Sequence, residues 1–173
     1  MNIRFSFRAG LGLASTALFF VTGASAAPTR YTDPSGYSID IPSGFKRVSG
    51  GAIDVSGYRL WDAPDGSRIT ARLWPPSTPQ SKATFLQQTR AMWNVKGSKL
   101  QSADVIEGSG QTIYLVRGTQ AIRRMPGGVA FVNDVSINTQ TGNMRLGLSV
   151  PPAKAKASRA QLFALLKSLR ISK

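Results

Sequence analysis

Three short glycine-containing joints divide residues 103–150 into four segments with strand character. The joints are Gly108-Ser109-Gly110, Pro126-Gly127-Gly128 and Thr141-Gly142-Asn143, and each has the residue types of a hairpin turn. The strands predicted between them cover 103–107, 111–121, 129–139 and 143–150. Joints this short make each strand return beside the one before it, so this region predicts an antiparallel meander.

Two further stretches extend the predicted sheet. Residues 37–41 alternate apolar and polar side chains, which is typical of a strand with one buried face. Residues 52–62 and 67–74 form a second predicted hairpin around the turn sequence Asp62-Ala63-Pro64-Asp65-Gly66.

Two segments have helical periodicity instead. The first carries a stripe at Phe85, Leu86, Thr89, Met92 and Trp93, with a start expected near Ser77 or Thr78 and a stop at Gly97. In the second, Ser158 and Gln161 have the spacing of a capping box before a leucine-rich face. Hairpins with so few helices predict an α+β fold, with a mainly antiparallel sheet of about six strands flanked by helices.

The N-terminus has the three parts of a secretory signal peptide. Arg4 and Arg8 precede a short apolar run over 11–23, and Ala24-Ser25-Ala26 is a small-x-small cleavage site. We therefore predict a signal peptide over 1–26, a single domain over 27–173, and export, to the periplasm in preference to the medium. The run is too short for a membrane span of about 20 apolar residues.

The residue composition limits the kinds of catalytic and metal site that the chain can form. The chain contains no His and no Cys, which excludes a Ser-His-Asp triad, a cysteine nucleophile, a disulfide and imidazole or thiolate metal sites. We predict no catalytic residue, no metal and no cofactor. Removing Arg4 and Arg8 with the leader leaves 20 basic and 8 acidic residues, a net charge of +12.

The opening of the exported region, Tyr31-Thr-Asp-Pro-Ser-Gly-Tyr-Ser-Ile-Asp-Ile-Pro-Ser-Gly-Phe45, resembles that of the PsbP/Mog1-like families, which include exported bacterial proteins similar to DcrB. The order of predicted elements is similar too, over most of residues 30–171. The resemblance implies an antiparallel sheet flanked by helices, in proteins that bind other proteins or assist assemblies. It transfers no binding residue to this chain.

Basic residues near the predicted hairpins suggest a cationic face with aromatic walls, suited to an anionic ligand or an acidic partner. Residues Arg68, Thr70, Arg72 and Trp74 share one side of a predicted strand, and Arg59 and Trp61 share a side of its partner. The alternative interpretation is a solvated face whose two tryptophans belong to the core. The candidate face consists of Arg59, Arg68, Arg72, Arg123 and Arg124.

Asp134 lies in the middle of a predicted strand, where a carboxylate needs a partner. A turn near Met125-Pro126 places it opposite Arg117, so a buried Asp134–Arg117 ion pair is expected. The alternative is that Asp134 is a functional carboxylate.

These features predict an exported, non-catalytic binding or accessory protein of the cell envelope. Its partners would be anionic lipid headgroups, lipopolysaccharide phosphates, acidic polysaccharide or an acidic protein, with peripheral membrane contact. No specific nucleic acid is expected after export, and the oligomeric state stays open. Two alternatives remain: a small hydrolase using Asp134 or Asp40, and an inhibitor or immunity-type protein that presents the loop over 123–128.

Overall fold

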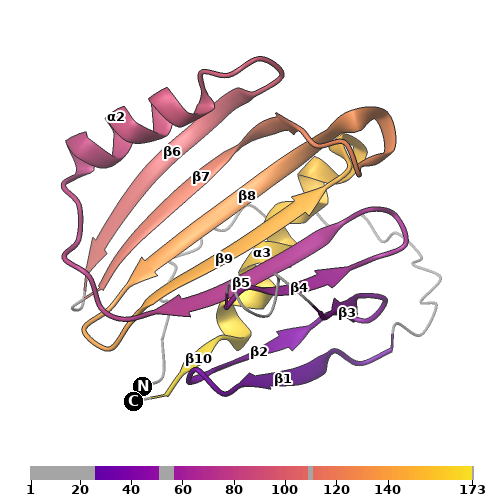
Figure 1. The fold of residues 1–173 in the computed structure, drawn as a ribbon, viewed down its shortest axis with the longest axis horizontal. Coiled ribbons are helices and arrows are strands. Elements are labelled where there is room, and N and C mark those ends of the chain that lie inside the picture. The colour runs from indigo at the N-terminus through magenta and orange to yellow at the C-terminus, as the bar shows by residue number, and fades with distance from the viewer. Residues whose placement is uncertain (1–25, 51–56, 109–110, 173) are drawn as a thin grey trace, which may run out of the picture.

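The computed structural model describes residues 26–50, 57–108 and 111–172, which form two antiparallel sheets and two α-helices (Figure 1). The large sheet contains, in spatial order, β3 (Lys46–Val48), β4 (Arg59–Asp62), β5 (Arg68–Trp74), β9 (Asn143–Val150), β8 (Val129–Asn138), β7 (Gln111–Ala121) and β6 (Lys99–Gly108). The small sheet contains β1 (Thr29–Asp33), β2 (Tyr37–Ile41) and β10 (Arg170–Ile171).

The predicted fold class and meander are confirmed. The bounds of β7 and β9 agree with the prediction, and β6 begins four residues earlier than expected. Ten strands are present in the described residues, more than the predicted six or so. The predicted strand over 52–62 is observed from Arg59, and its start lies outside the described residues, as does the predicted leader up to residue 25.

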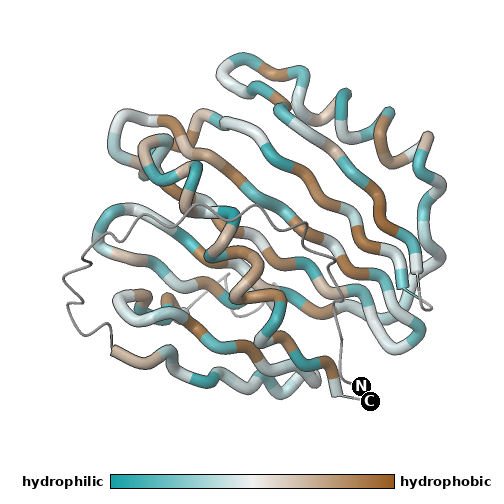
Figure 2. Tube along the Cα trace, turned by 180° about the vertical axis from the view of Figure 1, so that it is seen from behind, coloured by the Kyte–Doolittle hydropathy of each residue, from teal (hydrophilic) through white to brown (hydrophobic). Residues whose placement is uncertain are grey.

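Alternate side chains of the large sheet point to opposite faces. Leu115, Val135, Leu146 and Ala71 stand opposite one another from β7 to β5, and all four lie on what we call the inner face. Figure 2, seen from behind, shows apolar and polar positions alternating along these strands. The opposite side, called the outer face, therefore carries the polar residues.

Helix α3 (Ala155–Ser168) lies across the inner face and buries Leu162, Leu165 and Leu166 (Figure 1). Each fully buried leucine stabilises the fold by about 1.5–3 kcal/mol relative to an exposed one. Ile39 and Ile171 of the small sheet complete the same core. Among the described residues, no helix combines the length and the apolar character that crossing a bilayer requires.

Two consecutive hydrogen bonds between polar groups cross this apolar core. Asn133 on β8 donates from Nδ2 to Ser158 Oγ at 3.0 Å, and Ser158 donates to Ala155 O at 2.7 Å. The predicted capping box at Ser158 and Gln161 is therefore wrong: the N-cap of α3 is Lys154, four residues before Ser158, at the end of the 3-10 turn η2 (Pro152–Lys154). Because both partners are fully buried, Ser158 fixes α3 to β8.

A buried carboxylate links the two sheets. Asp33 at the end of β1 is 3% exposed and accepts hydrogen bonds from Arg59 Nε at 2.5 Å and from Tyr31 Oη at 2.8 Å. Burial raises the pKa of Asp33, but hydrogen bonds from Ser35, Tyr31 and Arg59 outweigh burial and hold the pKa below its ordinary value. The ionised form is therefore the one that stabilises the junction.

Helix α2 (Lys82–Trp93) lies over the outer face beside β6 and β7 (Figure 1). It starts later than predicted, because Ser81 is the N-cap and accepts a hydrogen bond from the Thr84 amide at 3.2 Å. Gly118 of β7 permits the close approach of the helix. A Cβ there would lie 2.4 Å from Lys99 O and 2.5 Å from the Trp93 ring.

We predict that Gly118→Ala destabilises the protein by about 1–3 kcal/mol, because the backbone of β6 and the Trp93 ring must both shift. Gly108→Ala is the matched control, since a Cβ at that strand glycine meets no atom of the described residues within 4 Å. Urea denaturation measures both free energies of unfolding. Equal stability of the two variants would contradict the proposed packing of α2.

We also predict that Asp33→Asn lowers the free energy of unfolding by about 2 kcal/mol at pH 7. Because the folded-state pKa is lowered, the carboxylate contributes stability above the unfolded-state pKa of about 3.8. That contribution is lost as the pH falls through the folded-state value, so the variant and the wild type converge in acid.

Asp40→Asn is the control for this pH series. Its ion pair with Arg30 is exposed on the small sheet, with side-chain exposures of 37% and 42%. We expect a change below about 1 kcal/mol at neutral pH. A loss of stability in Asp33→Asn that is the same at pH 7 and in acid would contradict the role of the ionised carboxylate.

Candidate functional site

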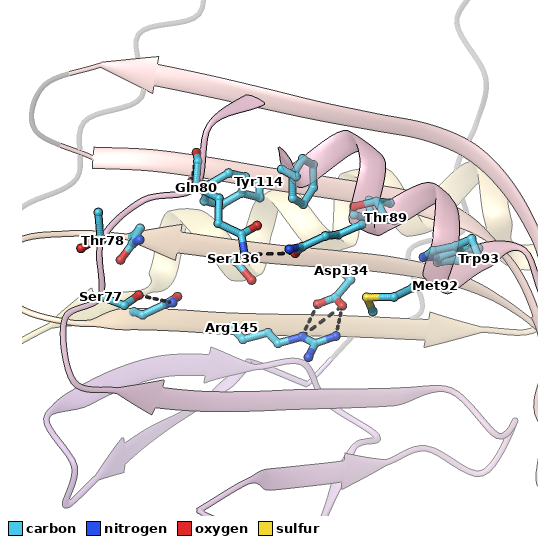
Figure 3. Close-up of a pocket in the computed structure, with 15 residues that line it drawn as sticks. Ser77, Thr78, Gln80, Thr89, Met92, Trp93, Tyr114, Asp134, Ser136 and Arg145 are labelled. Carbon is cyan, nitrogen blue, oxygen red and sulfur yellow. Dashed lines mark hydrogen bonds and ion pairs between the residues drawn. The ribbon is translucent and has the colours of Figure 1, made fainter. Parts of the chain in front are cut away.

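A groove lies between α2 and the outer face of the large sheet (Figure 3). Its main hollow has a volume of about 470 Å³, and a second hollow of about 230 Å³ adjoins it. Met92, Trp93, Asp134 and Arg145 line both hollows. Because α2 covers only one side of the outer face, the groove opens toward β9 and β5.

The strand register builds the floor of the groove. Tyr114, Ser136 and Arg145 stand opposite one another on β7, β8 and β9. In the next row Gly147 leaves space, since a Cβ at that position would lie 2.4 Å from Thr70 Oγ1. The wall comes from α2, where the Phe85 ring packs against Tyr114 with centroids 4.7 Å apart.

Asp134 and Arg145 form the charged centre of the floor (Figure 3). Arg145 Nε lies 3.0 Å from Asp134 Oδ1, and its Nη2 bonds to Oδ2, so the contact is a fork. The hydrogen bonds that Arg145 donates to Asp134 raise the pKa of Arg145 against the effect of burial, with a smaller contribution from Tyr58. The fork therefore holds Arg145 in its charged form.

The expected Asp134–Arg117 pair is wrong. The register places Asp134 opposite Val116, and Arg117 opposite Asn133. Arg117 is thus on the inner face, where its Nε donates to Asn133 Oδ1 at 3.2 Å. The prediction placed the β7–β8 turn one residue off, and an error of one residue moves a side chain to the other face of a sheet.

Arg72 lies next to this pair on the outer face. It stands opposite Arg145 in the β5–β9 register. Its guanidinium carbon lies 4.3 Å from the centroid of the Trp74 ring and 5.0 Å from that of Tyr58. The two rings meet edge to face, so they hold the guanidinium plane in position and leave its N–H groups for other acceptors.

The other candidate arginines are distributed differently. Arg59 is not on the outer face: it stands opposite the buried Ala71 and binds Asp33 on the other side of the sheet. Arg68 forms a fork with Asp62, and the hydrogen bonds that Arg68 donates lower the pKa of Asp62. Arg124 lies 3.9 Å from the same carboxylate. Arg123 is exposed. Only part of the predicted cationic face is thus one surface.

The two tryptophans also differ. Trp61 is 3% exposed and belongs to the core, as the alternative interpretation expected. Trp74 is half-buried on the outer face, where it stacks with Arg72. One tryptophan therefore serves packing, and the other supports a charged side chain.

The end of the groove near the start of β9 is polar. Asn143 donates to Ser77 Oγ at 3.3 Å, and Tyr114 Oη donates to Gln80 O at 2.8 Å. The Oδ1 atoms of Asn138 and Asn143 are buried and have no hydrogen-bond partner among the described residues. Buried acceptors of this kind are rare in folded proteins, so this end of the groove has unused hydrogen-bonding capacity.

The two carboxylates considered for hydrolysis lie apart in the fold. Asp40 is on β2 of the small sheet and binds Arg30, whereas Asp134 lies in the groove with Arg145 and Tyr114. Among the described residues that line the groove, Asp134 is the single carboxylate. The groove therefore lacks the paired carboxylates that most glycoside hydrolases use.

Sequence reasoning missed Arg145, Tyr58 and the asparagine end of the groove. The alternation of residues 143–150 would have placed Arg145 on the polar side of β9, and the hairpin order would have placed β9 in the sheet. The strand that pairs with the other edge of β9 was harder to identify, because that strand is β5, which lies far from β9 in the sequence.

We predict a coupling free energy of about 1 kcal/mol between Asp134 and Arg145, since the pair is a fork but is partly exposed. A double-mutant cycle with Asp134→Asn and Arg145→Gln, followed by urea denaturation, measures it. Asp134→Asn with Arg117→Gln is the matched cycle and is expected to show no coupling. Coupling to Arg117 instead would contradict the register.

Comparisons with known proteins show the fold. No protein-family model and no curated protein matches the sequence. The chain is similar to the solution structure of cyanobacterial PsbP (CyanoP) from Synechocystis, with a TM-score of 0.58 and 14% identity over 89% of this chain and 98% of that one. The Ran-binding protein Mog1p of Saccharomyces cerevisiae has a TM-score of 0.55 and 8% identity over 84% of this chain and 96% of its own.

A third similar structure is LpqN of Mycobacterium tuberculosis, described as involved in cell envelope biogenesis. It has a TM-score of 0.51 and 16% identity, over 84% of this chain and 90% of its own. Identities this low establish the architecture and no shared binding residues. The chain therefore has the PsbP/Mog1-like fold that its opening residues and element order indicate.

Proposed function

We propose that the chain is an exported, non-catalytic protein that binds phosphate or carboxylate groups of a cell-envelope component. The outer face around Arg72 and Arg145 is the binding surface. One observation carries the proposal: the Arg72 guanidinium is held between Tyr58 and Trp74, and no carboxylate partners it among the described residues. An arginine fixed in this way binds oxyanions with little loss of conformational entropy.

The charge of the neighbouring surface supports an anionic ligand. Residues 66–103 contain six Lys and Arg residues and no Asp or Glu. On the outer face Arg145 keeps its charge beside Arg72, and Asp134 offsets only one of the two cations. A surface with this excess of positive charge attracts anions over several ångströms, and salt weakens the attraction.

The envelope is the proposed location because of the N-terminal leader pattern, with Arg4 and Arg8 before an apolar run and the Ala24-Ser25-Ala26 site. The similar fold of LpqN, described as involved in cell envelope biogenesis, is compatible with this location.

A binding role fits the groove better than hydrolysis does. Asp134 is occupied by the fork to Arg145, and the chain has no histidine to act as a general base. Arg145, Arg72 and the asparagine end supply charge and hydrogen bonds for recognition. We therefore assign these residues to ligand binding.

The test uses two defined polyanions, lipopolysaccharide for phosphate and polygalacturonate for carboxylate. We expect the wild type to bind at least one of them, with an affinity that falls as salt rises. Arg72→Gln is expected to weaken binding about tenfold, the effect of losing a hydrogen bond to a charged group. Arg72→Lys keeps the charge but is also expected to bind more weakly, because the planar fork is lost.

Arg159→Gln is the matched control. Arg159 also lies over an aromatic ring, 5.6 Å from the Phe163 centroid, but on α3 and thus on the other side of the large sheet. Its substitution removes the same charge and is expected to leave the affinity unchanged. Equal weakening by Arg72→Gln and Arg159→Gln would show that binding reports net charge, and the proposed surface would be wrong.

A further inference from the structure

Two apolar side chains are exposed where α2 ends. Met92 is 66% exposed and Val95 is 55% exposed, and they lie only three residues apart. Trp93 between them is buried against β6 and β7, which fixes the segment on the sheet. Because both side chains are in solvent and lie close together in the chain, they form a small apolar projection on the surface and do not belong to the core.

The same segment carries three basic residues. Arg90, Lys96 and Lys99 are all exposed and flank Met92 and Val95 in sequence. No Asp or Glu occurs between residues 66 and 103. We call Arg90, Met92, Val95, Lys96 and Lys99 the α2 tip.

Among the described residues, the acids nearest to the α2 tip in the neighbouring elements are few. β6, which packs beside α2, carries the exposed Asp104 and Glu107, five and eight residues along the strand from Lys99. Gly97 lies against the end of β7, where a Cβ would come 2.9 Å from Ala121, and the exposed Arg123 follows two residues later. Asp134 faces Met92 across the groove but is paired with Arg145. Positive charge therefore dominates around the two apolar side chains.

We propose that the α2 tip docks the protein on a bilayer containing anionic lipids. Met92 and Val95 would enter the interface between headgroups and acyl chains, while the lysines and Arg90 contact lipid phosphates. The projection is too small for a stable protein interface, which buries about 800 Å² on each partner. Exposed apolar side chains with exposed cations before and after them in the chain match the chemistry of an anionic membrane surface instead.

Docking in this orientation would also place the groove. Met92 belongs to the α2 tip and lines the groove as well. The mouth of the groove would therefore lie close to the lipid headgroups. This surface does not include Arg72, so it can be tested separately from the proposed function.

Sedimentation with vesicles tests the proposal. The full chain is expressed and purified, and its N-terminus is determined once for all variants. We expect the wild type to bind phosphatidylcholine vesicles that contain phosphatidylglycerol and to bind pure phosphatidylcholine weakly. Met92→Ser with Val95→Ser is expected to weaken binding about tenfold. Lys96→Gln and Lys99→Gln should each weaken it roughly fivefold.

Ile106→Ser is the matched control, because Ile106 is the remaining large exposed apolar residue of the described chain, at 52% exposure. It lies on β6 between the acids Asp104 and Glu107, so we expect no change in vesicle binding. Circular dichroism confirms that each variant is folded.

Three results would overturn the proposal. The wild type could fail to bind anionic vesicles, or it could bind both vesicle types equally. The variant with Met92→Ser and Val95→Ser could also bind as tightly as the wild type. Arg72→Gln separates the two proposals. If it alone abolishes vesicle binding, the outer face binds lipid and the α2 tip does not. If it keeps vesicle binding but weakens binding to the polyanions of the first test, both proposals are supported.

Discussion

The two-residue alternation of the antiparallel sheet decides where each side chain of the site lies. Asn133 and Asp134 are neighbours in the sequence, yet Asn133 anchors α3 in the core and Asp134 lies in the groove. Ala71 and Arg72 are separated in the same way. Because the inner face is filled with apolar side chains, a shift of one residue would bury charges and expose the core. The core thus fixes the groove from the opposite side of the sheet.

The site also depends on the position of α2, which covers the outer face only in part. Gly118 lets Trp93 and the backbone of β6 come close to β7, and this contact holds the helix over one edge. The outer side of β5 and β9 is left uncovered by α2, so Arg72 and Arg145 reach solvent beside the groove. The position of one helix therefore creates both the hollow and the open cationic surface next to it.

Periodicity and turn chemistry predicted the meander well, because its strands are long and its joints contain glycine. The short strands β1, β3 and β10 were missed. β3 and β10 have only three and two residues, and β10 pairs with β2, which lies far away in the sequence. Asp134 was given the wrong partner because its strand register was predicted one residue off. The β7–β8 connection closes with Ile122 N bonded to Gly128 O, around a buried Met125, and no sequence pattern shows that register. Predicting which side chains meet across two strands requires the strand register, whereas predicting where the strands lie in the sequence does not.

The central claim is that Arg72 and Arg145 together bind an oxyanion on the outer face. NMR observation of the arginine Nε–Hε signals during titration with soluble polygalacturonate tests it most directly. The account predicts that the signals of Arg72 and Arg145 shift first and saturate together, while those of Arg59 and Arg159 stay unchanged. Uniform shifts of exposed arginines, or shifts that leave Arg72 unaffected, would contradict it.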